Sequence, residues 1–392
     1  MKKLILSVGL FLIGLGSAFA GTQWEIRGKI YDVDTVLHEA AGSGTTLTKL
    51  VLSGPDSQNI FYTTTDLTDE NVEVRVVKGK ETAKGLETLS SMAKRCSVGG
   101  DDYFIGVNSD FFERWPDSYS VGSVIADEEI VSLVNKDWSA FGITTDKNVY
   151  AGNLSFEGTV SSEKAGEYTL SAINRGGLKN SLVIYTLKTG SNSETGAFAT
   201  DIQLEIVGGT LTPNSVVKMK AVSAPDCRGG LDIPANGCVL SGNGTAAEYV
   251  SVLQEGETVE VRIATAFDGK IVKNLKHAVG GHPMILSEGK VLDTDTAIVN
   301  LPKLNPRTAV GFNANRTKLV LLVVDGRSEF AAGVISKQLA EIMRHVGCTE
   351  AMNFDGGGSS EMYSTRWGII NRPSDGKERP VSDALFLVAP KK

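Results

Sequence analysis

The chain has 392 residues, a net charge of −7 at pH 7, 41% hydrophobic residues and 22% charged residues. This length allows one large or two ordinary domains with a buried core, and the composition is ordinary for a globular protein. The negative charge and the lack of a basic run argue against a nucleic-acid partner, because a phosphate backbone has to be met by clustered Lys and Arg. Anionic small molecules remain compatible, since one or two arginines can bind them locally.

The N-terminus is typical of a secretory signal peptide. Two lysines precede the apolar run LILSVGLFLIGLG, and Ala18-Phe19-Ala20 forms a small-x-small cleavage site. We therefore expect residues 1–20 to be removed and the mature protein, residues 21–392, to be secreted or periplasmic. An uncleaved anchor is the alternative, but the run is shorter than the roughly 20 residues of a membrane span, so we expect no stable membrane insertion.

Export would bring the four cysteines into an oxidising compartment, where disulfides form. Cys227 and Cys238 bracket the short loop CRGGLDIPANGC. Their closeness in sequence makes them the pair that we expect to be bonded, although four cysteines allow three connectivities.

Most of the chain is patterned as short β-strands. NVEVRVV (71–77) and VEVRIAT (259–265) alternate, whereas SLVIYTL (181–187) and KLVLLVV (318–324) are nearly continuous apolar runs. The region 155–265 is strand-rich and has few site-like residues, so we expect it to be a β-rich lobe with an architectural role.

Helical patterning is scarce. SKQLAEIMRHVG, residues 336–347, has Ser336 as a candidate N-cap and Gly347 as a candidate terminator. Its apolar stripe at helical spacing consists of Leu339, Ile342, Met343 and Val346. A second candidate helix is GLETLSSMAKR, residues 85–95.

The order strand 318–324, helix 336–346, strand EAMNFDGGG predicts a βαβ unit, with its two strands parallel in one sheet. The expected fold is therefore α+β, a strand-dominated mixed sheet with few helices and a C-terminal βαβ element. Both strands end in Asp-Gly, at Asp325 and Asp355. Because the carboxyl ends of parallel strands meet at one sheet edge, these two segments should lie close together there.

The glycine run after Asp355 has the character of a ligand site. Consecutive glycines let a ligand approach the backbone, and their N–H groups, with the hydroxyls that follow, suit an anionic oxygen. The residues of this predicted cradle are Gly356, Gly357, Gly358, Ser359 and Ser360.

Other segments pair charged or polar residues with Gly or Pro at strand ends. GVNSDFF contributes Asn108 and Asp110, NPRTAVG contributes Arg307, and DGR contributes Arg327. Each of these residues alone has an ordinary interpretation as a turn or a solvated charge. Together they predict a site with carboxylates and arginines.

Taken together, the motifs of this chain resemble those of the phosphodiester glycosidase family. The resemblance rests on GVNSDFF, GGHPMILSEGK, NPRTAVGF, LLVVDGRS, AMNFDGGGSS and NRPSDGKERPVSDALFLV, in that order, and covers about residues 60 to 390. That family includes N-acetylglucosamine-1-phosphodiester alpha-N-acetylglucosaminidase and bacterial exopolysaccharide-related proteins.

The resemblance implies a hydrolase that cleaves a sugar 1-phosphodiester at the glycosidic bond. Glycosyl transfer passes through an oxocarbenium-like state that a carboxylate can stabilise or attack. Asp355 or Asp325 is then the expected nucleophile or base, and Asp110 the second carboxylate. Arg307, Arg327 and the glycine cradle would stabilise the phosphate, with Asn108 in a binding role.

Three departures from the family pattern stand in the motifs: Ser109 in place of a glycine, Asn305 where many members have His, and Glu361 after the two serines. They leave two alternatives open. One is an exported glycan-binding protein without turnover, and the other is a phosphodiesterase that uses a divalent cation, Ca²⁺ or Mg²⁺, held by carboxylates. For a glycosidase or a glycan-binding protein, the expected partner is a sugar phosphate or glycan. The oligomeric state is not predicted.

Overall fold

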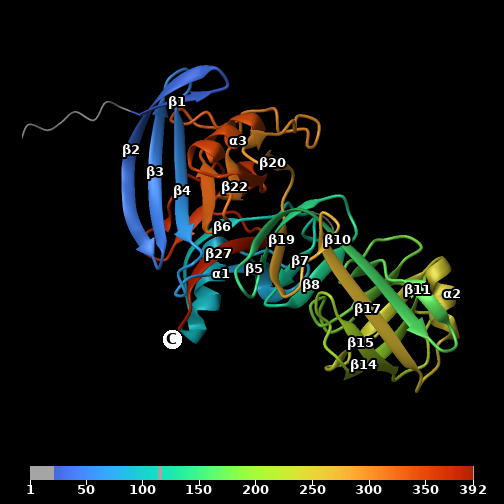
Figure 1. Ribbon diagram of the computed structural model, residues 1–392. Coiled ribbons are helices and arrows are strands. Elements are labelled where there is room, and N and C mark those ends of the chain that lie inside the picture. The colour runs from blue at the N-terminus through green and yellow to red at the C-terminus, as the bar shows by residue number, and fades with distance from the viewer. Residues whose placement is uncertain (1–21, 114–116, 392) are drawn as a thin grey trace, which may run out of the picture.

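The computed structural model describes residues 22–113 and 117–391, and the predicted signal peptide lies outside these residues. Three α-helices and three sheets make up this part of the chain, so the predicted strand-dominated α+β fold is confirmed (Figure 1). The helices are α1 (Leu89–Cys96), α2 (Thr245–Val252) and α3 (Ser336–His345), and the 3₁₀ turns are η1 (Gly79–Glu81), η2 (Ser97–Gly99) and η3 (Gly357–Ser359).

The first sheet has nine strands and carries the βαβ element. In spatial order its strands are β1 (Thr22–Ile26), β2 (Lys29–Gly42), β3 (Thr45–Ser53), β4 (Gln58–Asp66), β23 (Lys318–Val324), β22 (Arg307–Phe312), β24 (Glu350–Asn353), β20 (Met284–Ser287) and β21 (Lys290–Val291). Both β23 and β24 are antiparallel to β22, which lies between them. The two strands of the predicted βαβ unit are therefore parallel, as expected, with one strand inserted between them.

Strand β23 is buried on both faces, which explains its continuous apolar sequence. Leu319, Leu321 and Val323 pack into one core cluster, while the alternate residues pack into another, beneath α3. The predicted helical stripe faces that second cluster, with Leu339, Ile342 and Met343 fully buried and Val346 partly buried.

The ends of α3 match the prediction at one end only. Gly347 follows the helix with φ +96°, a conformation that favours glycine. Ser336 is not the cap, since it is the first helical residue and its hydroxyl bonds to Thr294 Oγ1 at 2.8 Å. The Gln338 side chain instead accepts a hydrogen bond from the Ile335 N–H at 3.0 Å, which satisfies one of the open donors of the first turn.

The second sheet has 13 strands and contains the region 155–265. In spatial order its strands are β11 (Gly166–Thr169), β10 (Val149–Ser162), β9 (Ser139–Thr144), β19 (Leu275–Gly280), β7 (Val124–Ala126), β8 (Glu129–Val134), β12 (Ala172–Ile173), β13 (Leu182–Tyr185), β16 (Gly237–Asn243), β14 (Ala199–Gly208), β15 (Val216–Ala221), β17 (Thr258–Phe267) and β18 (Lys270–Ile271). The long β10 pairs with β9 through its first half and with β17 through its second, which closes the pairings into a ring.

The predicted disulfide is wrong, because all four cysteines are free. Cys238 lies on β16 and points into the core, where its Sγ is 3.6 Å from the Sδ of Met219. Cys227 is exposed in the preceding loop. Because β16 directs the Cys238 side chain into the core, this thiol cannot reach a cysteine in a surface loop.

The third sheet has five strands and contacts the first. Its strands are β26 (Gly368–Ile369), β25 (Met362–Ser364), β6 (Asp102–Asn108), β27 (Asp383–Ala389) and β5 (Glu73–Lys78). In Figure 1 this sheet, with α1, lies between the nine-stranded sheet and the part of the chain that holds α2, β14 and β15.

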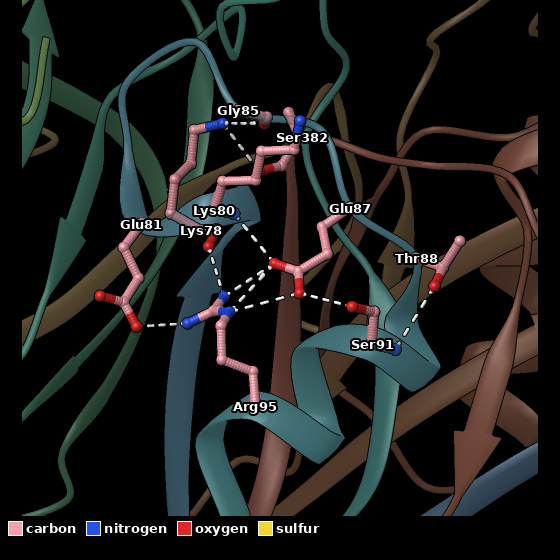
Figure 2. Close-up of polar contacts among 9 residues, drawn as sticks. All are labelled: Lys78, Lys80, Glu81, Gly85, Glu87, Thr88, Ser91, Arg95 and Ser382. Carbon is pink, nitrogen blue, oxygen red and sulfur yellow. Dashed lines mark hydrogen bonds and ion pairs between the residues drawn. The ribbon is translucent and has the colours of Figure 1, made fainter. Parts of the chain in front are cut away.

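Helix α1 begins four residues later than predicted, after Thr88, whose hydroxyl accepts from the Ser91 N–H at 3.3 Å. Figure 2 shows how it attaches: Arg95 reaches from the helix to the Glu87 carboxylate and to the Lys78 carbonyl oxygen, at 2.9 and 3.1 Å. The buried Lys78 ammonium donates to the carbonyl oxygens of Gly85 and Ser382 at 2.9 and 2.8 Å. These contacts fix the start of β27 next to the end of β5.

Candidate functional site

Three strand ends of the nine-stranded sheet meet at one edge. Strand β22 runs opposite to β23 and β24, so its first residue, Arg307, pairs with Val324 at the end of β23. The segments that follow β23 and β24 begin at Asp325 and Phe354. The sequence predicted that the two Asp-Gly segments meet here, and the antiparallel β22 adds Arg307 to the same edge.

A pocket of about 200 Å³ opens at this edge. Six residues of the predicted site line it: Arg307, Arg327, Asp355, Gly356, Gly357 and Gly358. Phe111, Ile298, Asn300, Leu301, Asn305 and Arg379 complete the lining.

The glycines of the loop are required because arginine side chains press against its backbone. A Cβ on Gly358 would lie 1.9 Å from Nη2 of Arg379, and one on Gly357 would lie 2.9 Å from Nη2 of Arg327. Gly357 also has φ +65°, a left-handed conformation that favours glycine. The guanidinium groups can therefore approach the backbone more closely than any other residue type would allow.

Arg307 is held rigidly by the backbone around it. Its Nε donates to the Val334 carbonyl oxygen at 3.1 Å, and its Nη2 donates to the carbonyl oxygens of Asn300 and Lys303 at 2.7 and 2.9 Å. Burial and the neighbouring Arg327 charge lower the pKa of Arg307 to about 10, although the Asp355 carboxylate acts in the opposite direction. The side chain is thus a cation at neutral pH with its position set before any ligand arrives.

The other two arginines are also positioned by side-chain partners. Arg327 has φ +58° and donates from Nε and Nη2 to the Asn305 side-chain oxygen at 3.0 and 2.8 Å. Arg379 donates from Nε to Asp375 at 2.8 Å and from Nη1 to the Ser359 hydroxyl at 3.3 Å. Three guanidinium groups and one carboxylate, Asp355, therefore line the pocket, which gives it a surplus of positive charge.

Asn108 joins the third sheet to the site. Its Nδ2 donates to the Asp355 carbonyl oxygen at 2.7 Å, and its Oδ1 accepts from the Thr308 hydroxyl at 2.7 Å and the Glu361 N–H at 3.2 Å. The Asp355 N–H donates to the Ser109 carbonyl oxygen at 2.8 Å. Asn108 does not line the pocket, and its contacts position the segment that does.

Asp110 is fully buried and lies outside the pocket lining. Its carboxyl accepts from the N–H groups of Phe111 and Gly122 at 2.8 and 2.7 Å and from Trp138 Nε1 at 2.9 Å. Burial, together with the neighbouring Asp383 carboxylate, raises the pKa of Asp110 well above its usual range. Phe111, whose backbone it holds, is the part of this segment that reaches the pocket.

Asp325 is likewise buried and is not among the lining residues. Its Oδ1 accepts from Asn371 Nδ2 at 3.1 Å and from the Arg372 N–H at 3.0 Å. Burial raises the pKa of Asp325, and these hydrogen bonds work against that rise. The catalytic roles of Asp110 and Asp325 stay predictions, and of the three predicted catalytic carboxylates Asp355 alone lines the pocket.

The end of the glycine segment is buried. The Ser360 hydroxyl and the Oε2 of Glu361 make no hydrogen bond to the residues that the structure describes. Glu361 Oε1 accepts from the Arg379 N–H at 2.7 Å. Burial raises the pKa of Glu361 to about 8, so this carboxyl is largely protonated at neutral pH.

The sequence analysis did not select Arg379, Asn305 or Phe111 as site residues, although each stands in a segment quoted there. Arg379 comes from the loop before β27 and reaches back to the glycine loop across the short strands β25 and β26 in the sequence. Within the described ranges 22–113 and 117–391, no group of three or more His, Cys, Asp or Glu side chains is placed to hold a metal ion.

Comparison with known proteins confirms the family. Residues 205–388 match the phosphodiester glycosidase family model, which confirms the resemblance predicted from the motifs. The match includes Arg307, Arg327, Asp355 and Arg379, while Asn108 and Asp110 precede it. A glycosidase-like function is thereby supported in general terms.

A curated relative is the SPbeta prophage-derived uncharacterized protein YomE of Bacillus subtilis (strain 168), which is 37% identical over 95 residues, 24% of this chain and 14% of its own length. The match thus spans only a small part of that relative.

Two solved structures have the same fold. A hypothetical protein from Synechocystis is 18% identical, with a TM-score of 0.71 over 88% of this chain and 62% of its own. A protein from Burkholderia pseudomallei K96243 described as exported is 17% identical, with a TM-score of 0.72 over 94% of this chain and 99% of its own. At these identities the likeness shows the fold alone. In the described part of the chain, no helix combines the length and apolarity of a membrane span.

Proposed function

We propose that this protein is an exported glycosidase that hydrolyses a sugar 1-phosphodiester at the glycosidic bond, with an alpha-linked N-acetylhexosamine as the sugar. The observation that carries the proposal is the pocket of Arg307, Arg327, Arg379 and the glycine backbone around a single lining carboxylate, Asp355. Such a pocket suits a substrate that has an anionic phosphodiester joined to a neutral sugar.

The arginines would bind the phosphate, which is the leaving group. Because a phosphate monoester leaves as a stable anion, charge stabilisation matters more than protonation of the leaving oxygen. Arg307 is already fixed by four backbone carbonyl oxygens, so its charge needs little reorganisation when the bond breaks. This arrangement fits cleavage between the sugar carbon and the phosphate oxygen.

Asp355 is our candidate for the nucleophile or base. In an alpha-linked N-acetylhexosamine the acetamido group lies on the same face as the leaving group, so it cannot attack from behind. A protein carboxylate or a water activated by one is then required. The buried Asp110 and Asp325 would act by positioning: Asp110 holds the backbone of Phe111, and Asp325 holds that of Arg372.

The test is the release of free sugar from an alpha-N-acetylglucosaminyl 1-phosphate diester by the mature wild-type protein and by Asp355→Asn. We expect the variant to retain its fold and to lose activity by at least about a hundredfold, the usual scale for a group that acts in the transition state. In ¹⁸O-labelled water, the label should enter the sugar.

Label in the phosphate would refute the proposal and indicate a phosphodiesterase, whose metal dependence EDTA and added Ca²⁺ or Mg²⁺ would reveal. Tight binding of the diester without release of sugar would instead indicate a glycan-binding protein.

Export is part of the proposal and has its own test. The lysines, apolar run and Ala18-Phe19-Ala20 sequence support cleavage after Ala20. N-terminal sequencing of the protein recovered from outside the cytoplasm should begin at Gly21. A product that retains Met1 would contradict it.

A further inference from the structure

A larger pocket, of about 620 Å³, shares no lining residue with the Asp355 pocket. Its walls come from the segments 176–180, 193–199 and 241–244, with Lys84, Tyr119 and Tyr185 between them. The volume is that of a typical small-molecule site. None of these residues belongs to the site described above, so the pocket needs an explanation of its own.

Two phenol hydroxyl groups meet at one side of this pocket. A Cβ on Gly176 would lie 3.4 Å from the Tyr119 hydroxyl and 3.8 Å from the Tyr185 hydroxyl, so both lie against the Gly176 backbone. Tyr185 is only 7% exposed and lines the pocket, and its hydroxyl lies next to the same glycine as that of Tyr119. A phenol hydroxyl can both donate and accept a hydrogen bond, so Tyr185 offers the pocket a group that a ligand can bind.

The charged groups that line the pocket balance in number, with two ammonium groups, Lys84 and Lys179, and two carboxylates, Asp117 and Glu194. The Lys84 ammonium lies 3.1 Å from an Asp117 oxygen and 2.6 Å from a Glu194 oxygen, so it has no surplus charge to offer a phosphate. Further polar lining comes from Ser193 and Thr195, whose hydroxyls donate to the buried Asp201 at 2.8 and 2.5 Å. The Asp355 pocket differs in this respect, because its three arginines outnumber its carboxylate.

An exposed aromatic ring stands among these polar groups. Phe198 lines the pocket and is 94% exposed, the most exposed large hydrophobic side chain in the part of the chain described. A phenylalanine so exposed gains free energy when another apolar surface covers it. One face of a pyranose ring is made of C–H groups while its edge carries hydroxyls, so a sugar can cover the ring and also reach the polar lining.

We infer that this pocket binds a neutral saccharide, as a glycan site separate from the Asp355 pocket. Phe198 stacks on one sugar ring, and the hydroxyls of that sugar bond to Tyr185 and the polar lining. Binding here does not require hydrolysis at Asp355, so the inference does not rest on the proposed function.

The test is saturation-transfer NMR and calorimetry of the mature protein with triacetylchitotriose and with maltotriose. We expect one of these neutral probes to bind, and Phe198→Ala to weaken its binding about tenfold or more, the loss typical of an aromatic anchor. Tyr185→Phe, which removes only the hydroxyl, should weaken binding several-fold. Phe330→Ala is the matched control, because Phe330 is 56% exposed and lines neither pocket.

Three results would overturn the inference. The first is no transfer to either probe, and the second is binding that neither Phe198→Ala nor Tyr185→Phe changes. The third is a sedimentation measurement in which wild type associates and Phe198→Ala does not, since Phe198 would then serve self-association. Binding that survives in Arg327→Ala supports the inference, and binding lost in that variant would assign the saccharide to the Asp355 pocket.

Discussion

At the scale of single residues, the glycine loop and Arg379 form one unit. A methyl group on Gly358 would collide with Arg379 Nη2 and, at 2.4 Å, with Asp375 Oδ1, which are the ends of side chains that can move. We therefore expect Gly358→Ala to displace the Arg379 guanidinium without unfolding the protein. Loss of one charge-assisted hydrogen bond to the phosphate, about 1.5 kcal/mol, would raise the KM for the diester about tenfold.

Steady-state kinetics and thermal denaturation check this prediction. Gly99→Ala is the control, since a Cβ there would meet no atom within 4 Å and Gly99 has no left-handed φ. An unchanged KM in Gly358→Ala would show that Arg379 does not bind the phosphate.

Also at the residue scale, Glu361 makes the stability of the folded protein depend on pH. Burial raises its pKa from 4.5 to about 8, and the Glu378 carboxylate adds to the rise. A folded-state pKa above the unfolded value contributes stability that is complete below about pH 4.5 and is lost as the pH rises through about 8. Glu361→Gln keeps the shape of the side chain and stays neutral, so the variant does not lose this stability as the pH rises.

We expect the Tm of Glu361→Gln to rise relative to wild type by a few degrees between pH 5 and pH 9, with little change in the difference below pH 5. Thermal denaturation over this range measures the effect. A difference between the two proteins that stays constant across the range would mean that Glu361 is ionised already at low pH.

The sequence predicted parts of the site whose signals are local. KLVLLVVDGR and AMNFDGGG mark two strand ends, and their parallel direction follows from the helix between them. The sequence could not predict that β22 lies between those strands, because pairing between distant segments leaves no local pattern. For the same reason Arg379, which arrives from the loop before β27, was not selected, and Asn108 was selected without its contacts to the Asp355 segment.

At the scale of elements, α1 is attached by one partly buried ion pair. The Arg95 guanidinium binds Glu87, whose side chain is 10% exposed, and the Lys78 carbonyl oxygen (Figure 2). Removing the cation leaves a largely buried carboxylate without its main partner. We expect Arg95→Met to lower the free energy of unfolding by about 1–3 kcal/mol.

Urea denaturation measures this loss. Arg228→Met is the matched control, since Arg228 also pairs with a carboxylate, Asp226, but its side chain is 85% exposed. We expect the control to change the free energy of unfolding by less than about 1 kcal/mol. Equal small effects in the two variants would contradict an anchoring role for Arg95.

At the scale of the whole molecule, the two ends of the region 155–265 lie side by side. Leu154, just before this region, pairs with Phe267, just after it, and the Asp268 N–H donates to the Asn153 carbonyl oxygen at 2.9 Å. This geometry is typical of a separable lobe. The strand pairings support the opposite view, because β8, which precedes the region, pairs with β12 inside it.

The hydrophobic core determines the expected effect of removing the region 155–265. Ile130, Leu133 and Leu275 lie outside the region but belong to the same buried cluster as its strands. Full exposure of a large apolar side chain costs about 1.5–3 kcal/mol, and a protein has only about 5–15 kcal/mol of stability in total. We therefore propose that 155–265 is not an independent lobe but shares one core with β7, β8, β9 and β19.

The corresponding experiment replaces residues 155–266 with an Asn-Gly turn, which joins paired strands without strain. We expect this variant to be insoluble or to unfold without cooperativity, and the excised region alone to fail in the same way, because each half leaves part of the shared cluster exposed to water. Solubility on expression and urea denaturation followed by near-UV circular dichroism report the outcome. A soluble excision variant that unfolds cooperatively would show that the Asp355 pocket stands on a domain complete without the region, and would show that the β-rich lobe expected from the sequence is separable.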